Sequence, residues 1–335
     1  MGMQLEDKIV IVTRQTRMKG LLKRYATRGQ ARFYLQRARA AEEEVQLKSK
    51  KPGTPSPQPA LMEFEALEEE DESYTSAIDH LKRELELGPR VQVIDREFVP
   101  NFLFGPHDII VTVGQDGLVA NTAKYAGRRP IVGVNPDPRR IDGVLLPFSV
   151  DEARVAVRAV LNGRAKYREV NLAEAHLPDG QHLLAFNDLF VGNKSHVSAR
   201  YRLDFEGKSE PQISSGVLIS TGAGSTGWLS SVFNMAAGIT SVLPGAKPTS
   251  SPAIKWSWEE QRLVFVVREP FISKQSRATL VTGMLEQNGE LVIESMMPEG
   301  GVIFSDGVES DFLQFNAGVI ARVRSSQQKA RLVVA

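Results

Sequence analysis

The sequence predicts an α/β protein in two parts: an N-terminal Rossmann-like domain with a parallel sheet, and a C-terminal β-rich domain similar to a β-sandwich. Three observations predict this. A chain of 335 residues is long enough for two ordinary domains. In its first half apolar runs alternate with helical patterns, which favours parallel strands joined by helices. In its second half short apolar runs follow one another with little helix between them. We place the domains at residues 1–165 and 166–335, with the functional site at their interface.

The first strand is predicted at Lys8–Thr13, a short apolar run, and a helical pattern follows it. Residues from about 44 to 73 combine a Pro-, Gly-, Ser- and Lys-rich segment with an acidic run and offer few apolar side chains. We therefore expect a mobile excursion there. A helix is predicted next, from about Tyr74 to Leu87.

The rest of the first half continues the alternation of strand and helix. Apolar runs predict strands at Val91–Ile94, Ile109–Val113 and Ile131–Val134. Ser149 followed by Glu152 fits a capping box at the start of a helix, and Gly163 suits its C-terminal cap. We expect this helix to close the first domain.

The second half is predicted to be a series of short strands with one helix. The strands are expected at Leu183–Val191, Ala199–Phe205, Val217–Ser220, Leu263–Val267, Ala278–Leu285, Leu291–Glu294 and Val302–Phe304. The helix is expected at about Thr226–Ala237, directly after the loop Thr221–Ser225.

Composition excludes several kinds of chemistry. The chain has no cysteine, which removes disulfides, zinc–cysteine sites and thiol catalysis, and its five histidines lack metal-ligand spacing. Any metal would be a hard ion bound by oxygen, such as Mg²⁺, and no set of ligands for it is identified. No apolar run approaches the roughly 18 to 20 residues of a spanning helix, and the first residues lack an apolar signal core. We expect a cytoplasmic protein without a membrane span.

Charge is distributed unevenly, although the net charge is only +1. Residues 8–41 contain basic but no acidic side chains, while the charged side chains of residues 42–72 are mostly acidic. The basic stretch can face a polyphosphate or a nucleic acid, or it can be a solvated helix face balanced by the acidic segment. Aromatic side chains are not interleaved as in recognisable RNA-binding motifs, so we do not expect a nucleic-acid partner. The basic residues are Arg14, Arg17, Lys19, Lys23, Arg24, Arg28, Arg32, Arg37 and Arg39.

The turn Gly114-Gln115-Asp116-Gly117 lies between a predicted strand and a predicted helix. Its glycines can bring backbone amides near a phosphate at the helix N-terminus, although a purely structural turn has the same composition. Asp116 can accept the proton of a hydroxyl group or orient that hydroxyl for attack on a γ-phosphate.

Two later segments also carry polar groups suited to a nucleotide. Asn187-Asp188 follows an apolar run, where an amide and a carboxylate can bind ribose hydroxyls or can simply form a turn at the strand end. The loop Thr221–Trp228 fits a phosphate-binding loop and a helix cap equally well. Each motif is weak by itself.

The order of these motifs resembles the NAD kinase family across nearly the whole chain. Gly114–Gly117 is similar to the family's Gly-Gly-Asp-Gly motif, and Pro130–Asn135 to its Gly-Ile/Val-Asn strand. Asn187-Asp188 resembles the family's Asn-Glu motif, and Ser220–Trp228 its Thr-Gly-Ser-Thr-Ala-Tyr segment.

Further segments refine this resemblance. Pro136–Arg140 and the Asp at position 188 are similar to the mitochondrial-type branch. Phe304–Gly307 and Phe315–Ile320 look like the family's closing Asp-Gly hairpin and the strand after it.

The resemblance implies ATP-dependent phosphorylation of the adenosine ribose 2′-hydroxyl of NAD(H) to NADP(H), with Mg²⁺. It implies that Asp116 is the catalytic base, and that Asn187 and Asp188 hold the ribose and adenine side. Small-molecule nucleotides are then the partners, and a homo-oligomer through the β-rich domain is expected. The binding residues it implies are Gly114, Gln115, Gly117, Asn135, Asp137, Asn187, Asp188, Thr221, Gly224, Ser225, Thr226 and Trp228.

Two departures from the family pattern bear on activity. Gln115 replaces the second glycine of the turn, and Leu118 stands where the family usually has Thr. Gln115 can obstruct the approach of phosphates, force a different φ, or donate its amide to a phosphate. Two other functions therefore stay open: a kinase of another hydroxyl compound, such as a lipid or a sugar, and a catalytically weak nucleotide-binding or sensing protein.

Overall fold

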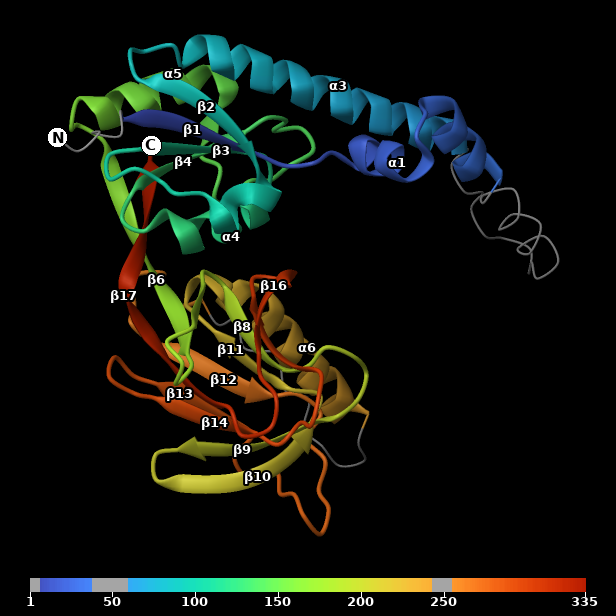
Figure 1. Cartoon of the computed structure of the whole chain (residues 1–335), viewed down its shortest axis with the longest axis vertical. Helices are drawn as coiled ribbons and strands as arrows, with labels where there is room; N and C mark the ends of the chain where they lie inside the picture. The colour runs from blue at the N-terminus through green and yellow to red at the C-terminus, as the bar shows by residue number, and fades with distance from the viewer. Residues whose placement is uncertain (1–6, 38–59, 243–254) are drawn as a thin grey trace.

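The computed structural model of the chain describes residues 7–37, 60–242 and 255–335 (Figure 1). Within those ranges every helix is too short or too polar to span a bilayer. The helices are α1 (Arg17–Tyr25), a helix over residues 28–37, α3 (Ala60–Glu84), α4 (Asp116–Ala126), α5 (Val150–Leu161), α6 (Trp228–Ser241) and the 3-10 turns η1 (Arg96–Asn101) and η2 (Ala223–Thr226). The strands are β1 (Lys8–Thr13), β2 (Arg90–Asp95), β3 (Ile109–Val113), β4 (Pro130–Asn135), β5 (Phe148–Ser149), β6 (Lys166–His176), β7 (His182–Ala185), β8 (Asp188–Asn193), β9 (Ala199–Phe205), β10 (Lys208–Ser214), β11 (Val217–Ser220), β12 (Leu263–Val267), β13 (Thr282–Leu285), β14 (Leu291–Ser295), β15 (Gly301–Ser305), β16 (Val308–Gln314) and β17 (Ile320–Val334).

The N-terminal half contains a parallel sheet in the order β2-β1-β3-β4, with β5 beside β4. Successive side chains of β1 point to opposite faces: Ile9 and Ile11 pack with α3 and α5, while Val10 and Val12 pack with α4 and η1. Because helices cover both faces, the central strands β1 and β3 are buried along almost their whole length. The predicted Rossmann-like parallel sheet is confirmed.

The capping box predicted at Ser149 and Glu152 is also confirmed. The Ser149 side chain accepts the backbone N–H of Glu152, and the Glu152 side chain accepts the Ser149 N–H, so the capping box closes the N-terminus of α5. Gly163 follows the end of α5 with φ of +65°, a left-handed conformation that glycine adopts without steric cost.

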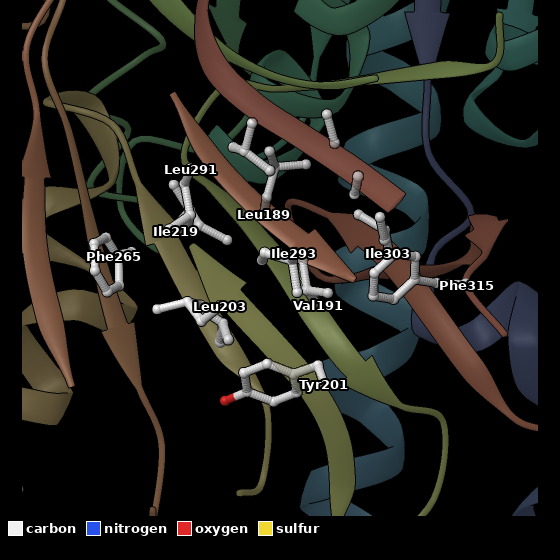
Figure 2. Close-up of a cluster of buried hydrophobic side chains, with 14 of the residues drawn as sticks. Leu189, Val191, Tyr201, Leu203, Ile219, Phe265, Leu291, Ile293, Ile303 and Phe315 are labelled. Carbon is white, nitrogen blue, oxygen red and sulfur yellow. The ribbon is translucent and has the colours of Figure 1, made fainter. Parts of the chain in front are cut away.

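The C-terminal half is a β-sandwich. One sheet runs β13-β12-β11-β8-β15-β16, and it packs against the antiparallel strands that include β9, β14, β17 and β6. Figure 2 shows side chains of both sheets meeting in the core, with Leu189 and Ile219 from the first sheet and Tyr201 and Ile293 from the second. Along β9 and β14 these inward-facing residues alternate with less buried ones.

The strand β17 belongs to both halves (Figure 1). Near its start Ala321 and Val323 pair with β14 of the sandwich, and near its end Arg331 and Leu332 pair in parallel with β4. β6 runs antiparallel beside it over most of its length, with an irregularity between Ser325 and Lys329. The last residues of the described chain therefore complete the N-terminal sheet, and a boundary between residues 165 and 166 stays a prediction.

The excursion predicted at about 44–73 is wrong for residues 60–73, which form the first half of α3; the segment 38–59 lies outside the described residues. Within and after the acidic run, a buried residue recurs every three or four positions. Phe64 and Leu67 pack with Met18 and Ala31, so this half of α3 has a core of its own. The buried positions of α3 and its end are Phe64, Leu67, Asp71, Tyr74, Ile78, Leu81 and Leu85.

Other boundaries differ from the prediction where polar turns interrupt an apolar run. The strand predicted at 183–191 is two strands, β7 and β8, separated by Phe186 and Asn187. Of the strand predicted at 278–285 only β13 forms, and residues 315–319 connect β16 to β17 rather than forming a strand. The helix predicted at 226–237 is α6, and it is preceded by η2.

Candidate active site

A cavity of about 350 Å³ lies between the two halves of the chain, and we call it the interface cavity. It gathers segments that are far apart in the sequence: the start of α4, the turn between β7 and β8, and the η2–α6 loop. Several residues named from the sequence meet here. The lining residues are Asp116, Val144, Leu145, Phe186, Asn187, Asp188, Ala223, Gly224, Thr226, Gly227, Trp228 and Trp258.

Asp116 is the first residue of α4 and is partly exposed in the interface cavity. Its carboxylate accepts the backbone N–H of Leu145 at 2.8 Å and of Val144 at 3.2 Å. The positive end of the α4 dipole favours a carboxylate at this position. Asp116 is thus a fixed, ionisable acceptor at the edge of the cavity.

Gln115 and Gly114 precede α4. The backbone of Gln115 has φ of −120° and ψ of 163°, an extended conformation open to any residue, so replacing glycine here costs no backbone strain. Gly114 is buried, and Gly117 is exposed in the first turn of α4. Neither glycine is among the residues that line the interface cavity.

The Gln115 side chain lines a second cavity of about 350 Å³, which we call the arginine cavity. Since Gln115 and Asp116 are sequence neighbours that line different cavities, the turn before α4 lies between the two. The lining residues are Arg14, Arg17, Glu70, Ser73, Tyr74, Gln115, Pro136, Asp137, Arg140 and Ile141.

Asn135 and Asp137 have different places near the arginine cavity. Asn135 is buried at the end of β4, where its amide donates to the Ile141 carbonyl at 2.9 Å and its Oδ1 accepts the N–H of Asp137 at 3.0 Å. Asn135 therefore holds the loop after β4. Asp137 lines the cavity, accepts the N–H of Arg139 and lies 3.7 Å from the Arg140 guanidinium.

The loop after β11 divides in a similar way. Thr221 and Ser225 are buried, and their hydroxyls donate to the Phe186 and Gly222 carbonyls at 2.6 and 2.7 Å. Gly224 passes so close to the Asn187 carbonyl that a Cβ there would lie 2.3 Å from its oxygen. These residues fix the loop against the Asn187 turn, while Gly224 and Thr226 line the cavity.

Trp228, the first residue of α6, separates the interface cavity from a larger one of about 900 Å³ on the outer face of the sandwich. Its indole stacks on the Phe190 ring with centroids 5.8 Å apart, and the Arg268 guanidinium lies 5.2 Å from its centroid. An aromatic ring held in this way offers a flat surface to a planar ligand group.

Asp306, in the turn between β15 and β16, holds the Asn187-Asp188 turn in place. Its carboxylate accepts the backbone N–H groups of Phe186, Asn187 and Asp188 at 3.0, 2.6 and 3.3 Å. The sequence identified Asp306 only as part of a hairpin, because hydrogen bonds to backbone groups 118 to 120 residues away leave no local pattern.

Asp188 is buried beside Asp306, and within the described residues its Oδ1 has no hydrogen-bond partner. Burial, together with the negative charge of Asp306, raises the pKa of Asp188 from 3.8 to about 7, while Ser220 opposes the shift. At neutral pH this carboxyl group is therefore poised between donor and acceptor forms.

Lys124 and Trp258 are further residues that the sequence did not single out. Lys124 is buried on α4 and donates to the Ser305 hydroxyl at 2.8 Å, which joins the Asp116 helix to the Asp306 hairpin. Burial lowers the pKa of Lys124. Trp258 lines the interface cavity and carries the Arg168 guanidinium 4.9 Å from its ring centroid.

No family model matches the sequence, but individual known proteins are similar to it. The NAD kinase of Chlorobium phaeobacteroides is 31% identical over 128 residues, which cover 36% of this chain and 43% of that protein. Mitochondrial NAD kinase 2 of Rattus norvegicus is 24% identical in an alignment of length 334. The alignment covers 79% of this chain and 76% of the rat protein. The chain is similar to NAD kinases. The match thus spans less than half of the Chlorobium relative and about three quarters of the rat one.

A solved structure of a kinase has a similar fold. Yeast NADH kinase complexed with NADH superposes with a TM-score of 0.55 and 17% identity, covering 99% of this chain and 84% of the yeast chain. The long match to a mitochondrial NAD kinase agrees with the motif resemblance of Pro136–Arg140 and Asp188 to that branch.

Proposed function

We propose that this chain is an NAD kinase-type phosphotransferase that transfers the γ-phosphoryl group of ATP to the adenosine ribose 2′-hydroxyl of NAD(H). One observation carries the proposal. Asp116 shares the interface cavity with Asn187 and Asp188, while the adjacent Gln115 lines a cavity with three arginines. In this proposal Asp116 is the general base and lies between a pocket suited to ribose hydroxyls and a pocket suited to phosphates.

These positions support a direct phosphoryl transfer. Asp116 accepts the proton of the 2′-hydroxyl as its oxygen attacks the γ-phosphorus, the bond to the β-phosphate oxygen breaks, and ADP leaves. Phosphoryl transfer gains most from positioning and from charge stabilisation. The guanidinium groups of Arg14, Arg17 and Arg140 would supply the positive charge.

Asn187 and Asp188 would select the acceptor. The pKa of about 7 for Asp188 gives this carboxyl group a proton on part of the molecules at neutral pH, so it can donate to an adenine or ribose acceptor as well as accept from a hydroxyl. Trp228 and Trp258 would provide flat apolar surfaces for the ring systems of the dinucleotide.

Magnesium, the homo-oligomer and the cytoplasmic location are parts of the proposal that rest on the resemblance and on the sequence. Among the described residues no three His, Asp or Glu side chains form a metal-binding group. Mg²⁺ in phosphoryl transfer needs only one or two carboxylates besides the phosphates, and Asp137 in the arginine cavity can supply one. The bound ion would neutralise phosphate charge.

The test is an assay of the purified chain with ATP, Mg²⁺ and separate acceptors: NAD, NADH, diacylglycerol and a set of sugars. Mass analysis of the products should show phosphorylated NAD or NADH. Phosphorylation of a lipid or sugar instead would identify a kinase of another hydroxyl compound. Binding of NAD and ATP without any phosphorylated product would identify a nucleotide-binding or sensing protein and contradict the proposal.

A further inference from the structure

The arginine cavity contains its own negative charges. Glu70 of α3 lies in the lining, where its carboxylate contacts the Arg14 guanidinium at 2.9 Å and the Arg17 guanidinium at 2.7 Å. Glu69, the preceding residue, contacts Arg140 at 2.8 Å. All three arginines of the cavity are thus engaged by carboxylates of one helix.

Glu70 is firmly ionised. Its burial would raise the pKa, but the hydrogen bonds and charges of Arg14 and Arg17 outweigh that effect and hold the pKa of Glu70 below its usual range. The Glu70 carboxylate therefore stays negative at neutral pH and occupies donor groups that a phosphate would use.

Arg14 does not need Glu70 to stay in place. The Tyr74 hydroxyl accepts the backbone N–H of Arg14 at 2.9 Å and donates to the Val113 carbonyl at 2.7 Å. The Arg14 guanidinium also lies 5.0 Å from the centroid of the Tyr74 ring. Removing the Glu70 charge would leave Arg14 positioned and free to bind another anion.

We propose that the arginine cavity is the site for the polyphosphate chain of the phosphoryl donor, and that Glu70, assisted by Glu69, is a built-in competitor that the polyphosphate displaces from the three arginines. The inference rests on the proposed function, and it adds the phosphate-binding side chains and a counter-ion that sets their affinity. The side chain of Arg17 is 70% exposed, so it can turn from Glu70 to an entering phosphate.

The ion pairs of the two glutamates differ in solvent exposure. Glu70 and Arg14 retain only 15% and 14% of their side-chain exposure, whereas Glu69 and Arg140 retain 69% and 44%. Exposed ion pairs are screened by solvent and contribute little, while a mostly buried pair is screened less. Loss of the Glu70 charge should therefore change anion affinity more than loss of the Glu69 charge.

The test measures binding of magnesium-free inorganic triphosphate to the full chain by calorimetry, beside the KM values for ATP and NAD. Glu70→Gln should lower the Kd for triphosphate and the KM for ATP about fivefold, and Glu69→Gln less than twofold, with the KM for NAD unchanged. Glu68→Gln removes the same charge from the same helix, but Glu68 contacts Arg28 outside the cavity, and this control should change neither value.

A matched pair on α1 tests the arginines. Arg17→Gln should weaken triphosphate binding, whereas Arg24→Gln, which removes an exposed arginine of the same helix outside the cavity, should not.

Unchanged or weaker triphosphate binding by Glu70→Gln would overturn the competitor role, even if NAD is phosphorylated. Tighter triphosphate binding without NAD phosphorylation would support the site and contradict the proposed function. If thermal unfolding shows that Glu70→Gln does not fold, Glu69→Gln is compared with Glu68→Gln. A small tightening of triphosphate binding in Glu69→Gln alone would support the competitor role at Arg140, and equal binding by the two variants would overturn it.

Discussion

The two cavities beside the Gln115-Asp116 turn have about the same volume, but their linings carry different chemical groups. The arginine cavity is built within the N-terminal half and has three guanidinium groups and two carboxylates in its lining. The interface cavity needs both halves of the chain and presents amide, carboxyl and aromatic groups. In the proposed function, one peptide bond separates residues for charge neutralisation from residues for proton transfer and hydroxyl recognition, so we expect single substitutions to change one role without the other.

The largest effect is expected at Asp116. Asp116→Asn keeps the size of the side chain but removes the proton acceptor, so kcat for NAD phosphorylation should fall roughly 100-fold or more while NAD and ATP still bind. Product formation and nucleotide titration measure the two effects separately. Asp142→Asn, an exposed acid of the loop that Asp116 contacts through Val144 and Leu145, is the control and should leave both unchanged. Equal rates for wild type and Asp116→Asn would refute the role of general base.

The second effect concerns pH and belongs to the interface cavity alone. In the folded chain the raised pKa of about 7 keeps Asp188 protonated, whereas the unfolded chain loses this proton near pH 4. Folding stability from this group is therefore present below pH 4 and is lost as the pH rises to about 7, by at most about 1.4 kcal/mol per pH unit.

Asp188→Asn should remove this dependence, because the amide does not titrate. The measurement is denaturant unfolding of wild type and Asp188→Asn between pH 5 and 8. The unfolding free energy of Asp188→Asn minus that of wild type should increase up to about pH 7 and then level off. Parallel curves for the two proteins would show that Asp188 is already ionised in the folded state. Asp142→Asn again serves as the control.

The smallest effect is expected at Gln115, on the arginine side of the turn. Since Gln115 already has an ordinary extended φ, Gln115→Gly relieves no strain and removes an amide from the cavity. We expect the KM for ATP to rise about threefold, the worth of one hydrogen bond, with the KM for NAD unchanged. Steady-state kinetics with each substrate varied measure this. A higher rate in Gln115→Gly would mean that the side chain obstructs the donor.

The sequence predicted the fold and the meeting of Asp116 with Asn187 and Asp188, because these rest on local apolar patterns and on motif order. It did not predict the role of α3. There the buried positions are separated by Glu and Asp residues that dominate the composition, and Asp71 itself takes a buried position by accepting the Thr16 hydroxyl.

The directions of side chains were the second feature that the sequence did not predict. Thr221 and Ser225 belong to the predicted loop, yet their hydroxyls donate to backbone carbonyls and fix the loop, and only the structure separates them from Gly224 and Thr226. The basic stretch likewise divides by position: Arg14 and Arg17 line the arginine cavity, whereas Arg28 pairs with Glu68 outside it.

The shared strand β17 bears on the order in which the protein can be made. β4 pairs with β17 through Pro130 and Ile131, and their partners Arg331 and Leu332 emerge from the ribosome about 200 residues later than β4 itself. During that interval this stretch of β4 is an open strand edge, which is a template for pairing with other chains. At an elongation rate of about 5 to 20 residues per second the exposure lasts tens of seconds at most. The parallel sheet is thus begun first and finished last, because the strand that completes it also belongs to the sandwich.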